Sequence, residues 1–149
     1  MAREINDRMP EYVVSLVAEA LNDVGKTVKG SKIAVLGVTY KPNVHDLQLT
    51  PMEKVVQKLV DMGGTVSIYD PMFKGEKVFG IRVANALEKA VKDVDCIVIG
   101  TSHKEFNSLN LAALCQVCRK PAALVDARHV IDPETAKRYG FAFRGVGRR

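Results

Sequence analysis

The stretch Lys32-Ile33-Ala34-Val35-Leu36-Gly37 decides the fold class of this 149-residue chain. It is short and apolar and is bounded by turn residues, a pattern typical of a parallel strand covered on both faces. Downstream, Thr50-Pro51-Met52-Glu53 has the order of a capping box, which predicts a helix over residues 51–62. A β-rich run at residues 65–70 then completes one strand-helix-strand unit.

The same alternation continues along the rest of the chain. Helical patterns occupy residues 85–92, the segment up to Cys118, and a short stretch that opens with Asp132-Pro133. Further strands are expected at residues 78–83, 95–100, 122–126 and 141–145. We therefore predict an α/β fold with a doubly wound, mainly parallel, six-stranded Rossmann-like sheet.

An added amphipathic helix precedes this sheet, over residues 10–28, where apolar side chains recur at helical spacing before Gly30. Because the sheet is complete without it, we expect this helix to lie outside the sheet's core. Such a helix is what a cut between two domains leaves. The predicted division is a helical segment at residues 1–30 and an α/β domain at residues 31–149.

Composition limits the classes of partner. The formal charge of +5 favours anionic ligands, but the basic residues are scattered among acidic ones, which argues against a nucleic-acid interface and suits a phosphorylated small molecule. The chain has neither an apolar run of membrane-spanning length nor the pattern of a secretory signal, so we expect no membrane partner and a cytoplasmic location. Three cysteines, an odd number, agree with a reducing compartment.

The expected ligand crevice lies outside the carboxyl ends of the strands, where the strand order reverses between the first and fourth strands. Loops that begin at Thr39 and Thr101 flank it, and a loop from Ala127 lies beside them. In the first loop, Tyr40-Lys41-Pro42 offers an aromatic face and a cation but lacks the glycines of a dinucleotide turn. Lys41 is either a diphosphate contact or a solvated lysine in a turn.

Other polar residues have plainer interpretations. Asp70 ends the second strand, where it either binds a ribose or forms a turn with Pro71. A zinc site needs more ligands than Cys115-x-x-Cys118 supplies, so we predict no metal site. The thiols are expected to be packing groups, and the histidines polar loop residues, in the set Cys96, Cys115, Cys118, His45, His103 and His129.

The segment from Gly37 to Pro51 is the most specific feature of the sequence. Its pattern Gly-x-x-Tyr-Lys-Pro-Asn-x-x-Asp-x-x-x-Thr-Pro resembles that of the UDP-binding domain of UDP-glucose/GDP-mannose dehydrogenases. Further stretches are similar to the same family and extend the resemblance over nearly the whole chain: Tyr69-Asp70-Pro71, residues 90–106, Val125-Asp126-Ala127-Arg128 and Gly145-Val146-Gly147-Arg148. Residues 2–14 resemble the end of the central helical region in the UDP-N-acetylmannosamine dehydrogenase branch.

This resemblance implies an NAD-dependent enzyme that oxidises the C6 alcohol of a UDP-sugar, here UDP-N-acetylmannosamine, to the uronate. The family's catalytic cysteine lies in a glycine-rich motif that this chain lacks, so the resemblance implies a fragment that is inactive alone. NAD would be bound mainly by an amino-terminal domain, and the full-length protein would be a homodimer. Tyr40 and Lys41 would contact the UDP-sugar, and Arg128 would supply a second cation unless it forms a surface salt bridge.

One departure concerns the cofactor side of the motif. The family's arginine is Gln48 here and its threonine is Val44, which leaves open whether this loop contacts the cofactor. Asp46 is retained and is expected to brace the loop through backbone hydrogen bonds. A stand-alone nucleotide-binding or regulatory α/β module, acting through a partner, remains the alternative to a dehydrogenase fragment.

Overall fold

A five-stranded, wholly parallel sheet forms the centre of the computed structural model, which describes residues 2–147. The strand order is β2-β1-β5-β6-β7, so the order reverses between β1 and β5 as predicted. The strands are β1 (Lys32–Leu36), β2 (Thr65–Tyr69), β5 (Cys96–Ile99), β6 (Ala123–Asp126) and β7 (Ala142–Gly145).

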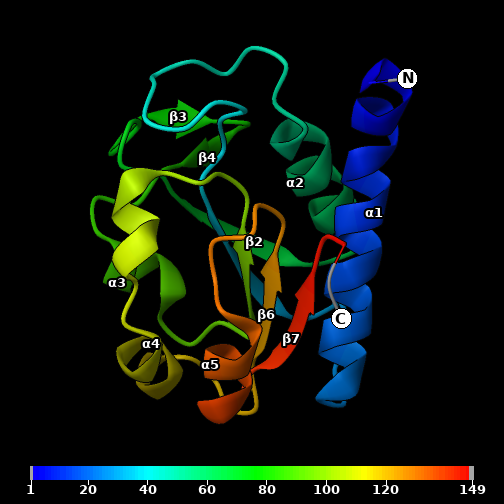
Figure 1. The fold of residues 1–149 in the computed structure, drawn as a ribbon, viewed down its shortest axis with the longest axis vertical. Helices are drawn as coiled ribbons and strands as arrows, with labels where there is room; N and C mark the ends of the chain where they lie inside the picture. The colour runs from blue at the N-terminus through cyan, green and yellow to red at the C-terminus, as the bar shows by residue number, and fades with distance from the viewer. Residues whose placement is uncertain (1, 148–149) are drawn as a thin grey trace.

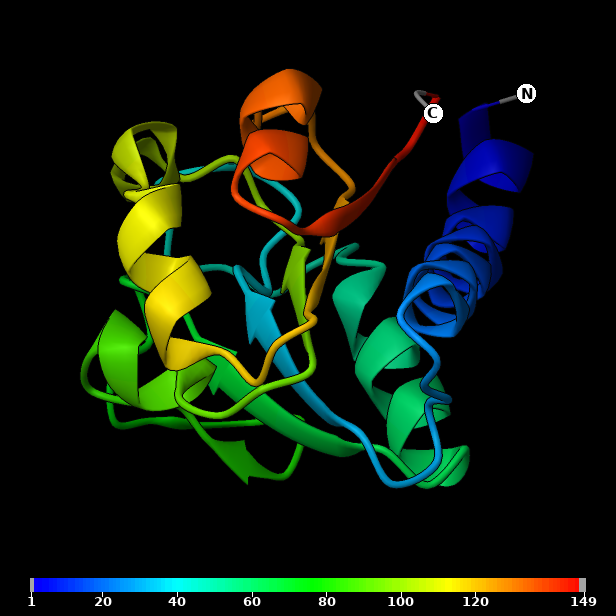
Figure 2. The same cartoon turned by 90° about the horizontal axis from the view of Figure 1, so that it is seen from below.

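Helices cover both faces of this sheet (Figures 1 and 2), with α1 (Ala2–Asp23) and α2 (Met52–Asp61) on one face. The other face carries α3 (Leu87–Val91), η1 (Lys104–Ser108), α4 (Leu111–Val117) and α5 (Pro133–Arg138). Alternate residues of β1 serve the two cores: Ile33 and Val35 pack toward α1 and α2, whereas Ala34 and Leu36 pack toward the opposite helices. This explains why the strand has no polar face.

The prediction of a sixth strand at residues 78–83 is wrong. That segment is a separate antiparallel hairpin of β3 (Lys77–Val78) and β4 (Ile81–Arg82). Phe79 and Gly80 form its turn with φ angles of 52° and 81°, the left-handed pair that a two-residue hairpin requires. The chain therefore folds back on itself beside β2, and just after β4 the Ala84 N–H donates to the Ile68 carbonyl of β2.

The first helix also differs from expectation. It begins at Ala2 and ends at Asp23, and Pro10 lies inside it. Val17, Ala20 and Leu21 are completely buried in one of the two cores, so the expectation that this helix lies outside the sheet's core is wrong. The proposed domain boundary near residue 30 stays a prediction, because close packing does not exclude it. Among residues 2–147, no helix has both the length and the apolar character needed to cross a membrane.

Local signals elsewhere are confirmed in part. The helix predicted after Thr50 is present, and the Thr50 hydroxyl accepts a 3.2 Å hydrogen bond from the Met52 N–H, but the capping box does not form: the N-cap of α2 is Pro51, and the Thr50 N–H donates to the Leu47 carbonyl. Asp132 caps α5 through the Thr135 N–H. Cys96 and Cys118 are buried packing groups, and burial raises the pKa of Cys118 to about 12, so its thiol stays protonated. Cys115 is half-buried and donates to the Tyr139 carbonyl.

An ion pair joins the end of α1 to the amino end of the sheet. Lys26 Nζ lies 2.8 Å from Oδ1 of Asp95, whose Oδ2 accepts from the Lys32 N–H at the same distance. Burial alone would raise the pKa of Asp95, but the hydrogen bonds from Lys26 and from the Lys32 N–H outweigh it and lower this pKa.

Replacing Lys26 with methionine is expected to destabilise the domain by about 3 kcal/mol at neutral pH, because a buried carboxylate loses its cation. Since the folded pKa of Asp95 is lowered, this stabilisation exists above the unfolded value of about 3.9 and disappears as pH falls through the folded pKa. Urea unfolding at neutral pH and near pH 3 checks this, with Lys54→Met on exposed α2 surface as the control. An equal loss at both pH values contradicts it.

Candidate functional site

The loops after β1 and β5 meet at the carboxyl edge of the sheet, where the crevice was expected. The Thr101 hydroxyl accepts from the Thr39 N–H at 3.0 Å and donates to the Thr39 carbonyl at 2.7 Å. Both threonines are completely buried. One side chain thus holds both backbone groups of the residue that starts the Tyr40-Lys41-Pro42 loop.

Two glycines allow this close approach. Gly37 has φ of +92°, and a Cβ there would lie 2.6 Å from the Thr101 Cβ and 2.7 Å from the Thr101 nitrogen. A Cβ at Gly100 would meet the Gly37 carbonyl oxygen and the end of Met52. The glycine in the first loop therefore serves the contact between two strands, in agreement with its poor match to a dinucleotide turn.

The structure brings Tyr40 and Arg128 together although 88 residues separate them. Arg128 Nη2 donates to the Tyr40 carbonyl at 2.8 Å, and the guanidinium carbon lies 5.6 Å from the centre of the Tyr40 ring. Both residues line a cavity of about 290 Å³ at the crevice, together with Met9, Val13, Pro51, Met52, Gly100 and Ala127. The partner of Arg128 is thus a backbone carbonyl of the expected ligand loop rather than the carboxylate of a surface salt bridge, which was the alternative from the sequence.

Arg128 is oriented by the end of its own strand. The buried Asp126 accepts hydrogen bonds from the Arg128 N–H at 3.0 Å and from the Ile131 N–H at 2.7 Å. This local turn directs the chain after β6 toward the first loop. Asp126 therefore has a structural role: its carboxylate holds the turn that carries Arg128.

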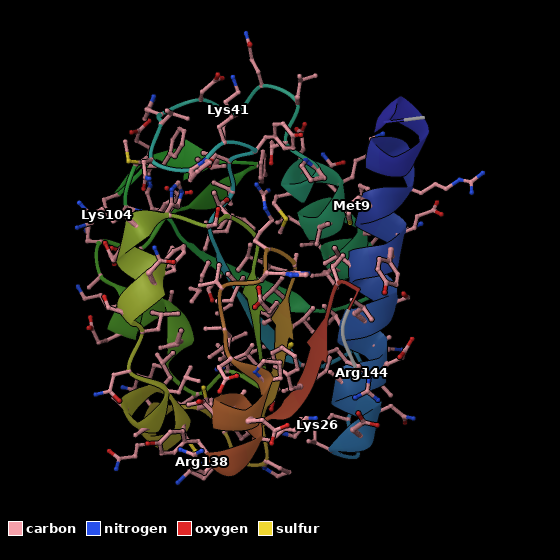
Figure 3. All side chains as sticks on the ribbon, in the orientation of Figure 1. Met9, Lys26, Lys41, Lys104, Arg138 and Arg144 are labelled. Atoms are coloured by element: carbon pink, nitrogen blue, oxygen red, sulfur yellow. The ribbon has the colours of Figure 1, made fainter. Side chains whose placement is uncertain are left out.

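Lys41 is an exposed residue of the same loop, and it is not among the described residues that line the cavity. Its carbonyl accepts a 2.7 Å hydrogen bond from the Thr39 hydroxyl, which curls the loop back on itself. Figure 3 places Lys41 on the loop at the end of the molecule toward which β6 and β7 point, with Met9 on neighbouring α1. Its side chain is therefore exposed to solvent at this end of the molecule.

The far part of this loop is braced at two points. Asp46 Oδ1 accepts from the Gln48 N–H at 2.9 Å, which confirms the bracing role expected for Asp46. His45 stacks on Phe73 at 4.0 Å between ring centres, and its Nε2 lies 3.0 Å from Glu76. The hydrogen bond to Glu76 raises the pKa of His45 above its ordinary value. Nothing in these contacts assigns Gln48 to a cofactor.

Two polar residues behave differently from the sequence interpretation. Asp70 does form the expected turn, with the Phe73 N–H donating to its carbonyl, but its carboxylate is completely buried and accepts from the backbone N–H groups of Val38 and Met72. His103, expected to be a polar loop residue, is also completely buried and lies 2.9 Å from Asp70. Sequence alone had no signal for this pair, because 33 residues separate its members.

The remaining candidates add no second site. Within residues 2–147, no group of three or more histidine, cysteine or carboxylate side chains gathers in a way that could hold a metal ion. His129 is exposed and its Nε2 lies 2.7 Å from the Val146 carbonyl oxygen. Arg148, the last residue of the closing motif, lies outside the described residues.

A doubly wound α/β sheet with a cation and an aromatic ring at its switch point defines a Rossmann-like ligand-binding domain. Comparison with known proteins makes this specific. The chain belongs to the UDP-glucose/GDP-mannose dehydrogenase family, whose UDP binding domain matches residues 34–133.

Individual relatives agree with this assignment. A UDP-N-acetyl-D-mannosamine dehydrogenase of Pyrococcus horikoshii is 35% identical over 148 residues, which cover 99% of this chain and 33% of the relative. A UDP-glucose 6-dehydrogenase of Rhizobium meliloti is 37% identical over 127 residues, which cover 83% of this chain and 29% of the relative. The solved structure of an NDP-N-acetyl-D-galactosaminuronic acid dehydrogenase from Methanosarcina mazei superposes with a TM-score of 0.90 at 31% identity, covering 99% of this chain and 31% of that one. The chain thus spans about a third of the length of the relatives it matches.

Proposed function

We propose that this chain is the UDP-sugar-binding domain of a longer NAD-dependent nucleotide-sugar 6-dehydrogenase, with UDP-N-acetylmannosamine as the substrate of the whole protein. The observation that carries the proposal is the pairing of Tyr40 and Arg128 beside the crevice cavity, in a domain of the UDP-binding family. NAD would be held mainly by the rest of the protein, which would work as a homodimer in the cytoplasm.

The residues divide the work of binding UDP by their chemistry. Arg128 offers planar, paired N–H donors that suit a phosphate, and Lys41 adds a mobile positive charge at the mouth of the crevice. Tyr40 supplies an aromatic face, while the apolar wall formed by Met9, Val13 and Met52 excludes water. When NAD is bound in the complete enzyme, it accepts hydride; this domain contributes substrate binding and orientation.

Relatives named UDP-N-acetyl-D-mannosamine dehydrogenase, at 31% and 36% identity over nearly the whole chain, support this choice of sugar. Oxidation of the sugar needs a nucleophile that Cys96 and Cys118 do not supply, since both are buried with raised pKa values, and the thiol of Cys115 is bonded to the Tyr139 carbonyl. We therefore expect the isolated chain to show no NAD reduction with any UDP-sugar. Turnover by this chain alone would contradict that part of the proposal.

Replacing Lys41 with alanine is expected to weaken UDP binding by about 10- to 100-fold, because a charged phosphate contact is lost. Isothermal titration of UDP and uridine against wild type and variant measures this. Uridine has no phosphate, so its affinity is expected to stay the same in both proteins.

Lys54→Ala, on the exposed surface of α2, is the matched control and should leave UDP affinity unchanged. Titrations with UDP-N-acetylmannosamine, NAD and a short oligonucleotide complete the experiment. Binding of NAD without UDP would overturn the domain assignment, and strongly salt-dependent oligonucleotide binding would favour a nucleic-acid function.

A further inference from the structure

A fully buried histidine lies beside the ligand crevice and makes no contact that the proposed function uses. His103 follows β5 and immediately precedes η1, and its side chain has no exposed surface. The ring of Phe106 lies 5.6 Å from it, centre to centre. A buried imidazole must satisfy both ring nitrogens or lose free energy, so its partners reveal its role.

The partners of the two ring nitrogens determine the tautomer of this ring. Nε2 has two neighbours, Asp70 and the more distant Thr39 hydroxyl at 3.5 Å, and Nδ1 has one. The Asn43 backbone N–H lies 2.9 Å from Nδ1, and a backbone amide can only donate, so Nδ1 must be unprotonated. Nε2 then carries the proton and donates to Oδ2 of Asp70, also at 2.9 Å. His103 is therefore neutral, with an acceptor directed at the loop and a donor directed at the end of β2.

Asn43 is held by a second hydrogen bond from the same segment. Its Oδ1 accepts from the Lys104 N–H at 2.8 Å. The backbone of Asn43 has φ of +62°, a left-handed conformation that asparagine adopts more readily than most residues. His103 and Lys104 thus hold both the backbone and the side chain of this turn residue.

The same network also holds the loop at its entry. Asp70, the partner of His103, accepts a 2.9 Å hydrogen bond from the Val38 N–H. Val38 precedes Tyr40-Lys41-Pro42, and Asn43 follows it. The buried pair therefore fixes the chain on both sides of the segment Tyr40-Lys41-Pro42, which contains two of the residues to which we assign UDP binding.

We propose that His103 is a positioning residue for UDP, which acts through the Asn43 N–H to hold Tyr40 and Lys41 in the geometry that binds the diphosphate. This inference rests on the proposed function. A loop that is already ordered loses less conformational entropy when the ligand binds, so the contact raises affinity without touching the ligand.

Two conservative substitutions separate the contact of Nδ1 with Asn43 from the contact of Nε2 with Asp70. In His103→Asn the amide oxygen occupies the place of Nδ1 and still accepts from Asn43, but the side chain is too short to reach Asp70. In His103→Gln the amide nitrogen takes the place of Nε2 and still donates to Asp70, but it leaves the Asn43 N–H without its acceptor. Both variants are neutral and both lose the ring.

We expect His103→Gln to weaken UDP binding about tenfold, and His103→Asn to stay within about threefold of wild type. Titration calorimetry with UDP measures this at a temperature where urea unfolding shows that both variants are folded. Equal affinities of wild type and His103→Gln, or equal losses in the two variants, would overturn the positioning role alone. Failure of the wild-type chain to bind UDP would instead overturn the proposed function.

Measurements on the ligand-free wild-type chain test the same contact without a variant. Nitrogen-15 NMR is expected to show a His103 ring protonated at Nε2 and not at Nδ1, and the Asn43 amide is expected to exchange slowly with solvent. A proton on Nδ1, or exchange of the Asn43 amide at the rate of an open loop, would overturn the proposal even if no variant folds.

Discussion

Replacing Gly37 with alanine is expected to lower the free energy of unfolding by about 4 kcal/mol, because two costs add. The first is conformational, since φ of +92° is unfavourable for a residue with a Cβ. The second is steric: the new Cβ would lie 2.6 Å from Thr101 Cβ and 2.7 Å from Thr101 backbone nitrogen. The backbone cannot rotate away without breaking the hydrogen bonds between Thr39 and Thr101.

Gly140→Ala separates the two costs. Gly140 has a nearly identical φ of +90°, but nothing lies within 4 Å of the position of its Cβ. This control is expected to lose only about 1–2 kcal/mol. Urea unfolding of both variants, with unchanged m-values, is the measurement. If Gly37→Ala is no less stable than Gly140→Ala, the close approach of the two strands is not tight enough to exclude a methyl group.

Replacing Asp70 with alanine is expected to cost about 3–5 kcal/mol of stability. Its buried carboxylate accepts from the N–H groups of Val38 and Met72 and from Nε2 of His103. Removal leaves all three donors without this acceptor. Asp70→Asn keeps one carbonyl oxygen but directs an NH2 group at a donor, so an intermediate loss of about 2 kcal/mol is expected.

Asp46→Ala is the matched control for this substitution. Asp46, like Asp70, accepts from a backbone N–H two residues further on, but it does so in an exposed loop. Its removal is expected to cost at most about 1 kcal/mol, because water replaces the lost acceptor. Chemical denaturation of the three variants compares them. Equal losses of unfolding free energy in Asp46→Ala and Asp70→Ala would show that burial of the Asp70 carboxylate does not add to its effect on stability.

The parts of the fold that the sequence predicted well are those that depend on near neighbours. The run at Lys32 had to be a strand buried on both faces, because it has no polar side for solvent. The helix predicted at residues 51–62 is observed at Met52–Asp61, because its apolar spacing depends only on near neighbours. The turn at Asp70 likewise needs only the adjacent proline.

The errors lie where local patterns leave more than one outcome. Residues 78–83 have the composition of a strand, and part of this segment does form short strands. They make a separate hairpin instead of joining the main sheet because Phe79 adopts a positive φ and turns the chain back. The first helix would be amphipathic whether it packed on the sheet or lay outside the core. Only its packing against β6, β7 and α2 decides that it belongs to the core.

For the site, the sequence by itself indicated the family and two of the residues that line the crevice cavity, Tyr40 and Arg128, since each belongs to a contiguous motif. Only the tertiary structure decided that Arg128 holds the Tyr40 carbonyl and that Asp70 and His103 form a buried pair. Those contacts join segments 88 and 33 residues apart. Their geometry follows from the parallel pairing of β1 with β2 and β5, and of β5 with β6, which brings distant strand ends to one edge and which no local pattern encodes.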